Sequence, residues 1–233
     1  MKEELYTIPV NDIFDTQCEC PICTMRQKLD EEEVAFAMGP SYMEDDIRLT
    51  TDKMGFCSHH LQMMYDFENR LGLGLILNTH LQDIIRNIES LQKKGRKSGS
   101  SLFRKGEPSP LIEYTNKLQN SCFICSRMEH TLKRYIATIF YLYERDSDFR
   151  TKFRKSQGFC ISHYGQLYEI APSYLRGQVL EDFTTDLNKI FLENLKNLQK
   201  DISWFVDKFD YRNADAPWKN SKDALHRAIK KIR

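Results

Sequence analysis

The sequence contains few of the residues that form tight turns, with only 7 prolines and 10 glycines among 233 residues. A protein of many short strands needs more such turns, so this scarcity argues against an all-β fold and favours helices. Neither sign of charge dominates, because 34 Lys and Arg stand against 33 Asp and Glu, for a net charge of +1. Bulk electrostatic attraction to nucleic acid or to an anionic membrane is therefore not expected.

Long apolar runs are also missing. The longest lies near Leu71 to Leu77, far short of the roughly 20 residues that a membrane span needs. The first residues are acidic where a secretion signal is basic, and no apolar segment follows them. We therefore expect a cytoplasmic protein without a membrane span. Thiols stay reduced in the cytoplasm, so the seven cysteines point to metal binding or redox chemistry rather than to disulfides.

A pattern of cysteine and histidine occurs twice. Cys-Pro-Ile-Cys at 20–23 returns as Cys-Phe-Ile-Cys at 122–125, an offset of 102. Gly-Phe-Cys-Ser-His-His at 55–60 returns as Gly-Phe-Cys-Ile-Ser-His at 158–163, an offset of 103. One inserted residue explains the change of offset, and the match predicts an internal duplication that covers roughly 18–94 and 120–198.

The spacing of apolar residues predicts helices throughout. One helix over 25–38 should end at the Gly-Pro at 39–40, and its counterpart should run from about 125 to 144. A long helix should follow each ligand histidine, with an apolar stripe expected to pack in an intramolecular core rather than at an oligomer interface. Pro172 should break the second of these helices near its start. The stripes are Leu77, Leu81, Ile84, Ile88 and Leu91 in the first repeat, and Leu180, Phe183, Leu187, Phe191, Leu195 and Leu198 in the second.

These patterns predict an all-α fold of two tandem, pseudo-equivalent zinc-stapled helical repeats with long bundle-forming helices. Residues 210–233 should add a loop and a short helix with Ala224, Leu225, Ala228 and Ile229 on one face. The segment between the repeats carries six basic residues before its first acidic one; it should be a flexible connector, or else contact nucleic acid or an acidic partner. The predicted domains are repeat 1 at 1–94, the basic linker at 95–110, repeat 2 at 111–209 and the C-terminal segment at 210–233.

Each repeat offers the four ligands of a closed tetrahedral zinc site. Cys-x2-Cys lets one turn aim two sulfurs at one point, and about 34 residues later Cys-x2-His places a sulfur and an imidazole on one helix face. Gly55 and Gly158, two residues before the third cysteine, suit a tight knuckle, and Phe56 and Phe159 should pack beside it. The predicted ligands of the two zinc ions are Cys20, Cys23, Cys57 and His60 in repeat 1, and Cys122, Cys125, Cys160 and His163 in repeat 2.

Other chemistries for these residues fit less well. Attachment of c-type haem needs a histidine directly after the Cys pair, where Thr24 and Ser126 stand. Iron–sulfur clusters mostly take four thiolates, and a redox dithiol needs a βαβ context. A catalytic zinc keeps an open position, whereas four protein ligands fill the shell.

The remaining cysteine and histidines lack counterparts in the other repeat. Alignment selects His60 as the ligand rather than His59, because repeat 2 has Ser162 and His163 at the equivalent positions. Cys18 is either a bystander thiol or a spare thiol that exchanges onto the zinc or forms a disulfide with a ligand when oxidised. The other unmatched histidines, interpreted as surface or core residues, are His80, His130 and His226.

Several further segments resemble an uncharacterised bacterial family of duplicated Cys3His helical proteins. They are Tyr-Thr-Ile-Pro-Val at 6–10, the first Cys pair, Gly-Pro-Ser-Tyr-Met-Glu-Asp-Asp at 39–46, Gly-Phe-Cys at 55–57 and Phe-Asp-Tyr-Arg at 209–212. The resemblance covers nearly the whole chain. Members often carry the automatic label "ABC transporter substrate-binding protein", and the resemblance implies no established activity.

The sequence shows no catalytic constellation, such as a Ser/His/Asp order or a phosphate-binding glycine loop. We therefore expect a non-enzymatic, cytosolic zinc-binding scaffold or interaction protein with an unidentified protein partner. A thiol-based redox or zinc sensor is the first alternative. A nucleic-acid-binding zinc protein is the second and the less expected, because acidic runs at 30–33 and 44–46 accompany the basic linker.

Overall fold

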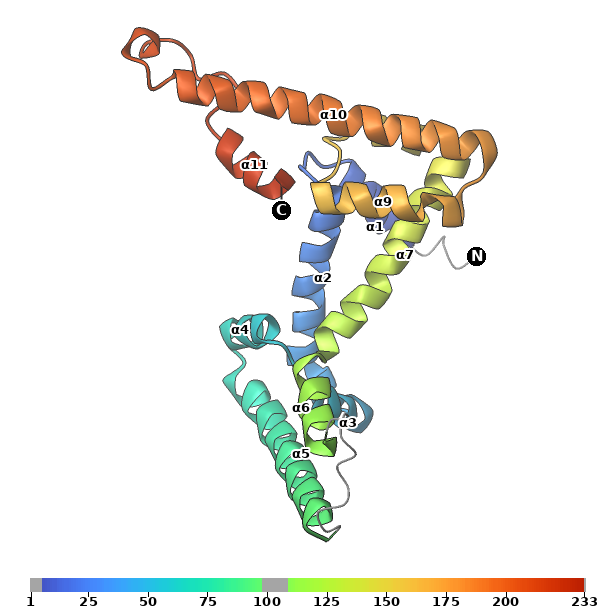
Figure 1. Ribbon diagram of the computed structural model, residues 1–233, viewed down its shortest axis with the longest axis vertical. Coiled ribbons are helices and arrows are strands. Elements are labelled where there is room, and N and C mark those ends of the chain that lie inside the picture. Colours follow the sequence, from blue (N-terminus) through green and yellow to red (C-terminus); the bar gives the residue numbers. More distant parts are fainter. Residues whose placement is uncertain (1–5, 98–108, 233) are drawn as a thin grey trace. The chain divides into compact units, whose positions relative to one another are not determined.

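The computed structural model describes residues 6–97 and 109–232, and these form eleven α-helices and no strand (Figure 1). The all-α prediction is confirmed. Most of the predicted basic linker at 95–110 lies outside the described residues. The helices are α1 Thr7–Phe14, α2 Pro21–Met38, α3 Asp45–Met54, α4 Ser58–Asp66, α5 Arg70–Lys97, α6 Pro110–Gln119, α7 Phe123–Arg145, α8 Ser147–Lys155, α9 Ile161–Tyr174, α10 Gly177–Asp207 and α11 Ala224–Ile232, with short 3-10 turns η2 Pro40–Met43 and η3 Tyr211–Asn213.

The same order of four helices follows each Cys pair, α2 to α5 in the first half and α7 to α10 in the second. Two helices, rather than one, follow each ligand histidine. Asn69 starts α5 by accepting a hydrogen bond from the Gly72 amide at 2.9 Å, as a helix cap does. In the second half the break falls at Leu175 and Arg176, a few residues after Pro172, which lies inside the last turns of α9.

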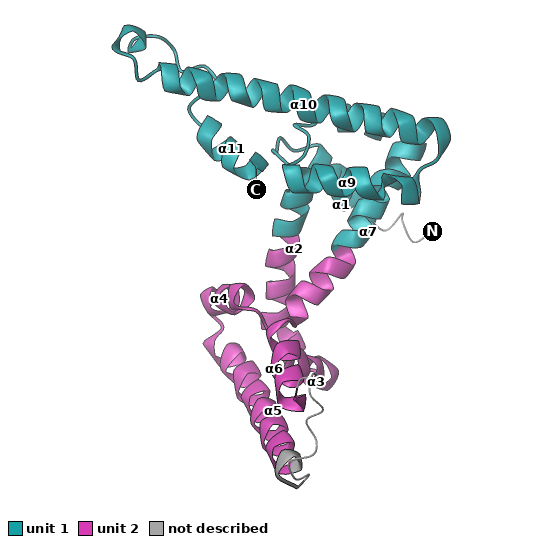
Figure 2. Cartoon of the chain, viewed as in Figure 1, with its two compact units in different colours: residues 1–27, 132–233 teal, residues 28–131 magenta. Residues whose placement is uncertain are grey.

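The chain divides into two compact units (Figure 2). Unit 1 comprises residues 1–27 and 132–233, and unit 2 comprises residues 28–131. These bounds differ from the predicted repeats at 1–94 and 111–209, since each unit takes the beginning of one repeat and the end of the other. Both boundaries fall inside a helix, α2 in the first half and α7 in the second.

Unit 1 has an aromatic core. The ring of Phe153 lies 5.3 Å from those of Tyr143 and Phe183 and 5.6 Å from that of Phe159, centroid to centroid. All four residues are fully buried. Helix α10 packs on α8, α9 and α11, and most of its predicted stripe is buried, namely Phe183, Leu187, Phe191 and Leu198.

Unit 2 is built around α5, which packs on α3, α4 and α6. Its predicted stripe is less covered than that of α10: Leu81 is 55% exposed, and the other four stripe residues are half-buried. The expectation of a buried seam therefore holds for α10 but not for α5, whose best-buried residues are Leu73 and Ile76 near its start. No helix in the described part of the chain is long and apolar enough to cross a membrane.

Candidate metal centres

All eight predicted ligands come together in two groups of four, and the ligand atoms of each group lie within 4.8 Å of one another. Each group has three cysteines and one histidine and could hold a metal ion. The unit 1 centre consists of Cys20, Cys23, Cys160 and His163, and the unit 2 centre consists of Cys57, His60, Cys122 and Cys125.

The predicted grouping of the ligands within each repeat is wrong. Each Cys-x2-Cys pair meets the Cys-x2-His pair from the other half of the chain. Helix lengths explain the exchange. Helix α2 has 18 residues and α3 has 10, so at 1.5 Å per residue they are about 27 Å and about 15 Å long. Helix α3 alone is too short to bring the chain back to the first Cys pair at the start of α2.

The unit 1 centre is compact and largely buried. Nδ1 of His163 lies 3.4 Å from Sγ of Cys20, 3.3 Å from Sγ of Cys23 and 3.2 Å from Sγ of Cys160. The sulfurs of Cys23 and Cys160 are 3.7 Å apart. Cys20 and Cys160 are buried and Cys23 is half-buried.

The unit 2 centre has almost the same geometry with more exposure. Nδ1 of His60 lies 3.2 Å from Sγ of Cys57, 3.3 Å from Sγ of Cys122 and 3.4 Å from Sγ of Cys125. The sulfurs of Cys57 and Cys125 are 3.8 Å apart. Cys125 is exposed, whereas Cys122 is buried.

These distances fit one tetrahedral ion in each centre. Zinc bonds of about 2.3 Å to sulfur and about 2.1 Å to nitrogen separate two sulfurs by about 3.8 Å, and a sulfur from a nitrogen by about 3.6 Å. The S···S distances of 3.7 and 3.8 Å match this shell, and the S···N distances are slightly shorter. A disulfide needs about 2.05 Å between sulfurs, so these cysteines are free thiols.

Helix starts aim the ligands of both centres. Cys57 and Cys160 are the extended residues that precede α4 and α9, and each ligand histidine sits in the first turn that follows. Partial positive charge at a helix start favours a thiolate there. Gly55 and Gly158 have positive φ angles of 62° and 75°, a backbone conformation that other residues resist, as expected for the knuckle.

The neighbouring aromatic residues differ between the knuckles. Phe159 is fully buried in unit 1, as predicted. Phe56 is only half-buried and meets the ring of Phe123 edge-on at 6.2 Å. The knuckle of unit 2 therefore has a more open surrounding than that of unit 1.

Asp30 orients the histidine of unit 2, a role that we did not predict. Nε2 of His60 is 2.9 Å from a carboxylate oxygen of Asp30, so Nδ1 is left to face the three sulfurs. A carboxylate behind a ligand histidine holds its tautomer and increases its basicity. Asp30 lies on α2, whose Cys pair belongs to the other centre, so no spacing in the sequence pointed to this role.

His59 stays outside both groups of sulfur ligands. It lies 3.9 Å from the Asp30 carboxylate and its side chain is 65% exposed. Cys18 is half-buried and belongs to neither centre. His80 Nδ1 is 2.8 Å from the Asp52 carbonyl oxygen, so it supports unit 2 from outside the centre.

Close packing of thiols and imidazole shifts their proton affinities. Hydrogen bonds with Cys160 and Cys23, together with burial, raise the pKa of Cys20 well above its ordinary value. Hydrogen bonds with Cys20 and Cys23 lower the pKa of Cys160. Burial alone would lower the pKa of His163, but its bonds to Cys160 and Cys23 outweigh burial and raise the pKa to about 9.

In unit 2, burial and the charge of Cys122 raise the pKa of Cys125 to about 12. A thiol with so high a pKa is protonated at neutral pH, and a cation must displace that proton to bind the sulfur. Both centres therefore couple metal binding to proton release.

The chain belongs to a family of unknown function, described as "Family of unknown function (DUF6062)", whose model matches residues 1–233. No curated protein and no solved structure matches it. Since these comparisons name no activity, a function must be inferred from the two Cys3His clusters.

Proposed function

We propose that this chain is a cytosolic zinc-binding scaffold or interaction protein with two structural Cys3His zinc centres and no catalytic role. The observation that carries the proposal is the pair of tetrahedral ligand groups, each closed by two segments far apart in the sequence. A metal ion that ties such segments stabilises the fold directly, because the unfolded chain lacks the preformed site.

The donor set supports zinc over other metals. Three thiolates and one imidazole are soft to borderline ligands, which zinc binds in closed structural sites. Hard cations such as Mg²⁺ and Ca²⁺ prefer oxygen ligands. With four protein ligands each centre is suited to holding the chain rather than to activating a substrate.

Exposed apolar side chains support the interaction role. On α11, Leu225, Ile229 and Ile232 are 47%, 62% and 63% exposed, so one apolar face of this helix is open. Phe209 and Tyr211, after α10, are 75% and 86% exposed. A row of exposed apolar side chains along one helix face, as on α11, is typical of protein contacts.

Elemental analysis of protein purified without added metal tests the zinc assignment. We expect two zinc ions per chain, and a strong chelator should lower helical circular dichroism and the melting temperature together. Iron with visible absorption would favour a cluster instead. A metal-free chain with full helicity and an unchanged melting temperature would contradict a structural role.

A pull-down from the native host tests the interaction role. We expect Ile229→Glu to lose a specific partner that wild type and Lys230→Glu both retain, because residue 230 is an exposed polar neighbour on the same helix. Identical partners for all three proteins, or none, would count against the α11 face as the contact surface.

Exposure of Cys125 favours a thiol-based sensor as a second candidate. Hydrogen peroxide would oxidise the thiols of Cys57 and Cys125 to a disulfide. The two thiols give up two electrons and two protons, which reduce one peroxide to two waters, and the zinc ion leaves. The sensor predicts zinc loss from unit 2 at low peroxide concentrations, reversed by thiol reductant. Equal resistance of both centres would remove this candidate.

A further inference from the structure

In unit 2 the two halves of the metal centre are tied directly to each other. The Phe123 amide, next to Cys122, donates to the Gly55 carbonyl at 2.9 Å. The Ser121 hydroxyl donates to the Met54 carbonyl at 2.6 Å. These two bonds join the residues just before the third cysteine to those around the Cys pair.

Unit 1 cannot form the same two bonds. The offsets of 102 and 103 place Pro21 and Gly158 where unit 2 has Phe123 and Gly55, and proline has no amide hydrogen to donate. Glu19 stands at the position of Ser121, and Gln157 at that of Met54. An exposed hydrogen bond of 3.1 Å joins the side chains of Gln157 and Gln17 there.

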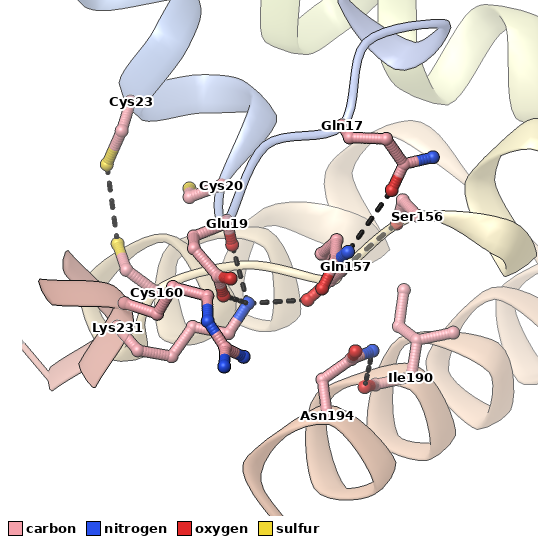
Figure 3. Close-up of polar contacts among 12 residues, drawn as sticks. Gln17, Glu19, Cys20, Cys23, Ser156, Gln157, Cys160, Ile190, Asn194 and Lys231 are labelled. Carbon is pink, nitrogen blue, oxygen red and sulfur yellow. Dashed lines mark hydrogen bonds and ion pairs between the residues drawn. The ribbon is translucent and has the colours of Figure 1, made fainter. Parts of the chain in front are cut away.

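A lysine from the end of the chain occupies this position in unit 1 (Figure 3). Lys231 is fully buried, and its ammonium donates to the carbonyl oxygens of both Glu19 and Gln157. The Glu19 carboxylate lies 3.2 Å from the same nitrogen. All three N–H donors of the ammonium are thereby used. Glu19 and Gln157 correspond to Ser121 and Met54, which bond directly to each other in unit 2.

Helix α11 is held so that Lys231 points inward. Arg227, one turn earlier, pairs with Asp201 of α10 at 2.9 Å, and Ala224 is fully buried. The large apolar residues of α11, Leu225, Ile229 and Ile232, are exposed instead. Burying a lysine amine is costly unless it is paired and fully hydrogen-bonded. Helix α11 nevertheless buries this lysine, next to residues adjoining the metal ligands, while it exposes its large apolar side chains.

We propose that Lys231 is a positioning residue for the unit 1 metal centre, and that metal retention by unit 1, but not by unit 2, depends on the docking of α11. The proposal rests on the proposed zinc binding. Lys231 holds the chain segments before Cys20 and Cys160 at a fixed separation.

The test is the alkylation rate of each cysteine in the full, zinc-loaded chain, measured with N-ethylmaleimide and peptide mass spectrometry. In Lys231→Met, we expect Cys20, Cys23 and Cys160 to react about tenfold faster or more, because two charge-assisted hydrogen bonds are lost. The cysteines of unit 2 should keep their rates. Lys230→Met, at an exposed neighbouring position, is the matched control and should behave like wild type.

A rescue variant separates positioning from general destabilisation. Pro21→Ala in the Lys231→Met chain restores an amide that can donate to Gly158 as Phe123 does to Gly55, and it should recover much of the protection. Equal acceleration of the cysteines in both units, or in neither, would overturn the role of Lys231. If added zinc protected no cysteine of the wild-type chain, the proposed zinc binding would fail instead.

Discussion

Replacing Asp30 should weaken metal binding in one centre only. Its carboxylate lies 2.9 Å from Nε2 of His60, His60 is 2% exposed, and the Asp30 side chain is 19% exposed. Helices α2 and α7 both run without interruption from their Cys pairs, so the equivalent of Asp30 is Leu132 (30 + 102). The apolar Leu132 cannot accept such a bond, and only unit 2 should depend on it.

The expected size follows from the role of the carboxylate. Losing the partner of a ligand histidine typically weakens metal binding about 10- to 100-fold, which is about 1.4–2.7 kcal/mol. Asp30→Ala should lose that affinity, whereas Asp30→Asn keeps an acceptor oxygen and should lose less. Competition with a chromophoric chelator should resolve one weakened and one unchanged zinc ion per chain.

Glu32→Ala is the control for the Asp30 experiment, because Glu32 is an exposed acid on the same helix. It should leave both affinities unchanged. The reasoning about His60 would be refuted if Asp30→Ala weakened both ions equally, or if it left both affinities at the wild-type value.

Three further predictions concern the knuckles, the thiols and the core. Gly55→Ala should destabilise the chain more than Gly158→Ala in denaturant titrations. Both glycines have positive φ, which costs other residues about 1–2 kcal/mol. A Cβ at Gly55 would lie 2.7 Å from His80 Nε2, whereas one at Gly158 would lie 3.5 Å from its nearest atom. Because the pKa of Cys125 is raised to about 12, zinc should displace its proton, so zinc affinity of unit 2 should rise with pH between 6 and 8 in chelator competition; a flat profile would contradict this. Phe183→Ala removes a fully buried ring and should lower the free energy of unfolding by about 3–5 kcal/mol. A loss under 1 kcal/mol would contradict the placement of Phe183 in the aromatic core of unit 1.

Local features of this protein could be predicted from its sequence. Residue spacing predicted the helices over 25–38 and 125–144, found as α2 and α7. It also predicted that the glycines before the third cysteines adopt a conformation that other residues resist. Each of these depends on residues within a few turns of one another, where periodicity and backbone preference act.

Long-range features could not be predicted in the same way. Either Cys-x2-His pair would complete the same Cys3His donor set with a given Cys pair. The order of the motifs along the chain favours neither grouping. The choice depends on the lengths of α2 and α3. Lys231 gave no signal at all, since one buried lysine among the basic residues at the end of the chain looks like a surface residue until its carbonyl partners are known.

The exchanged grouping of ligands is tested most directly by removing one cysteine and finding which others lose protection. In a zinc-loaded Cys20→Ser chain, N-ethylmaleimide labelling and peptide mass spectrometry should show Cys23 and Cys160 reacting rapidly. Cys57 should remain as protected as in wild type. Rapid labelling of Cys23 together with Cys57, while Cys160 stays protected, would contradict the exchanged centres and restore the grouping within each repeat.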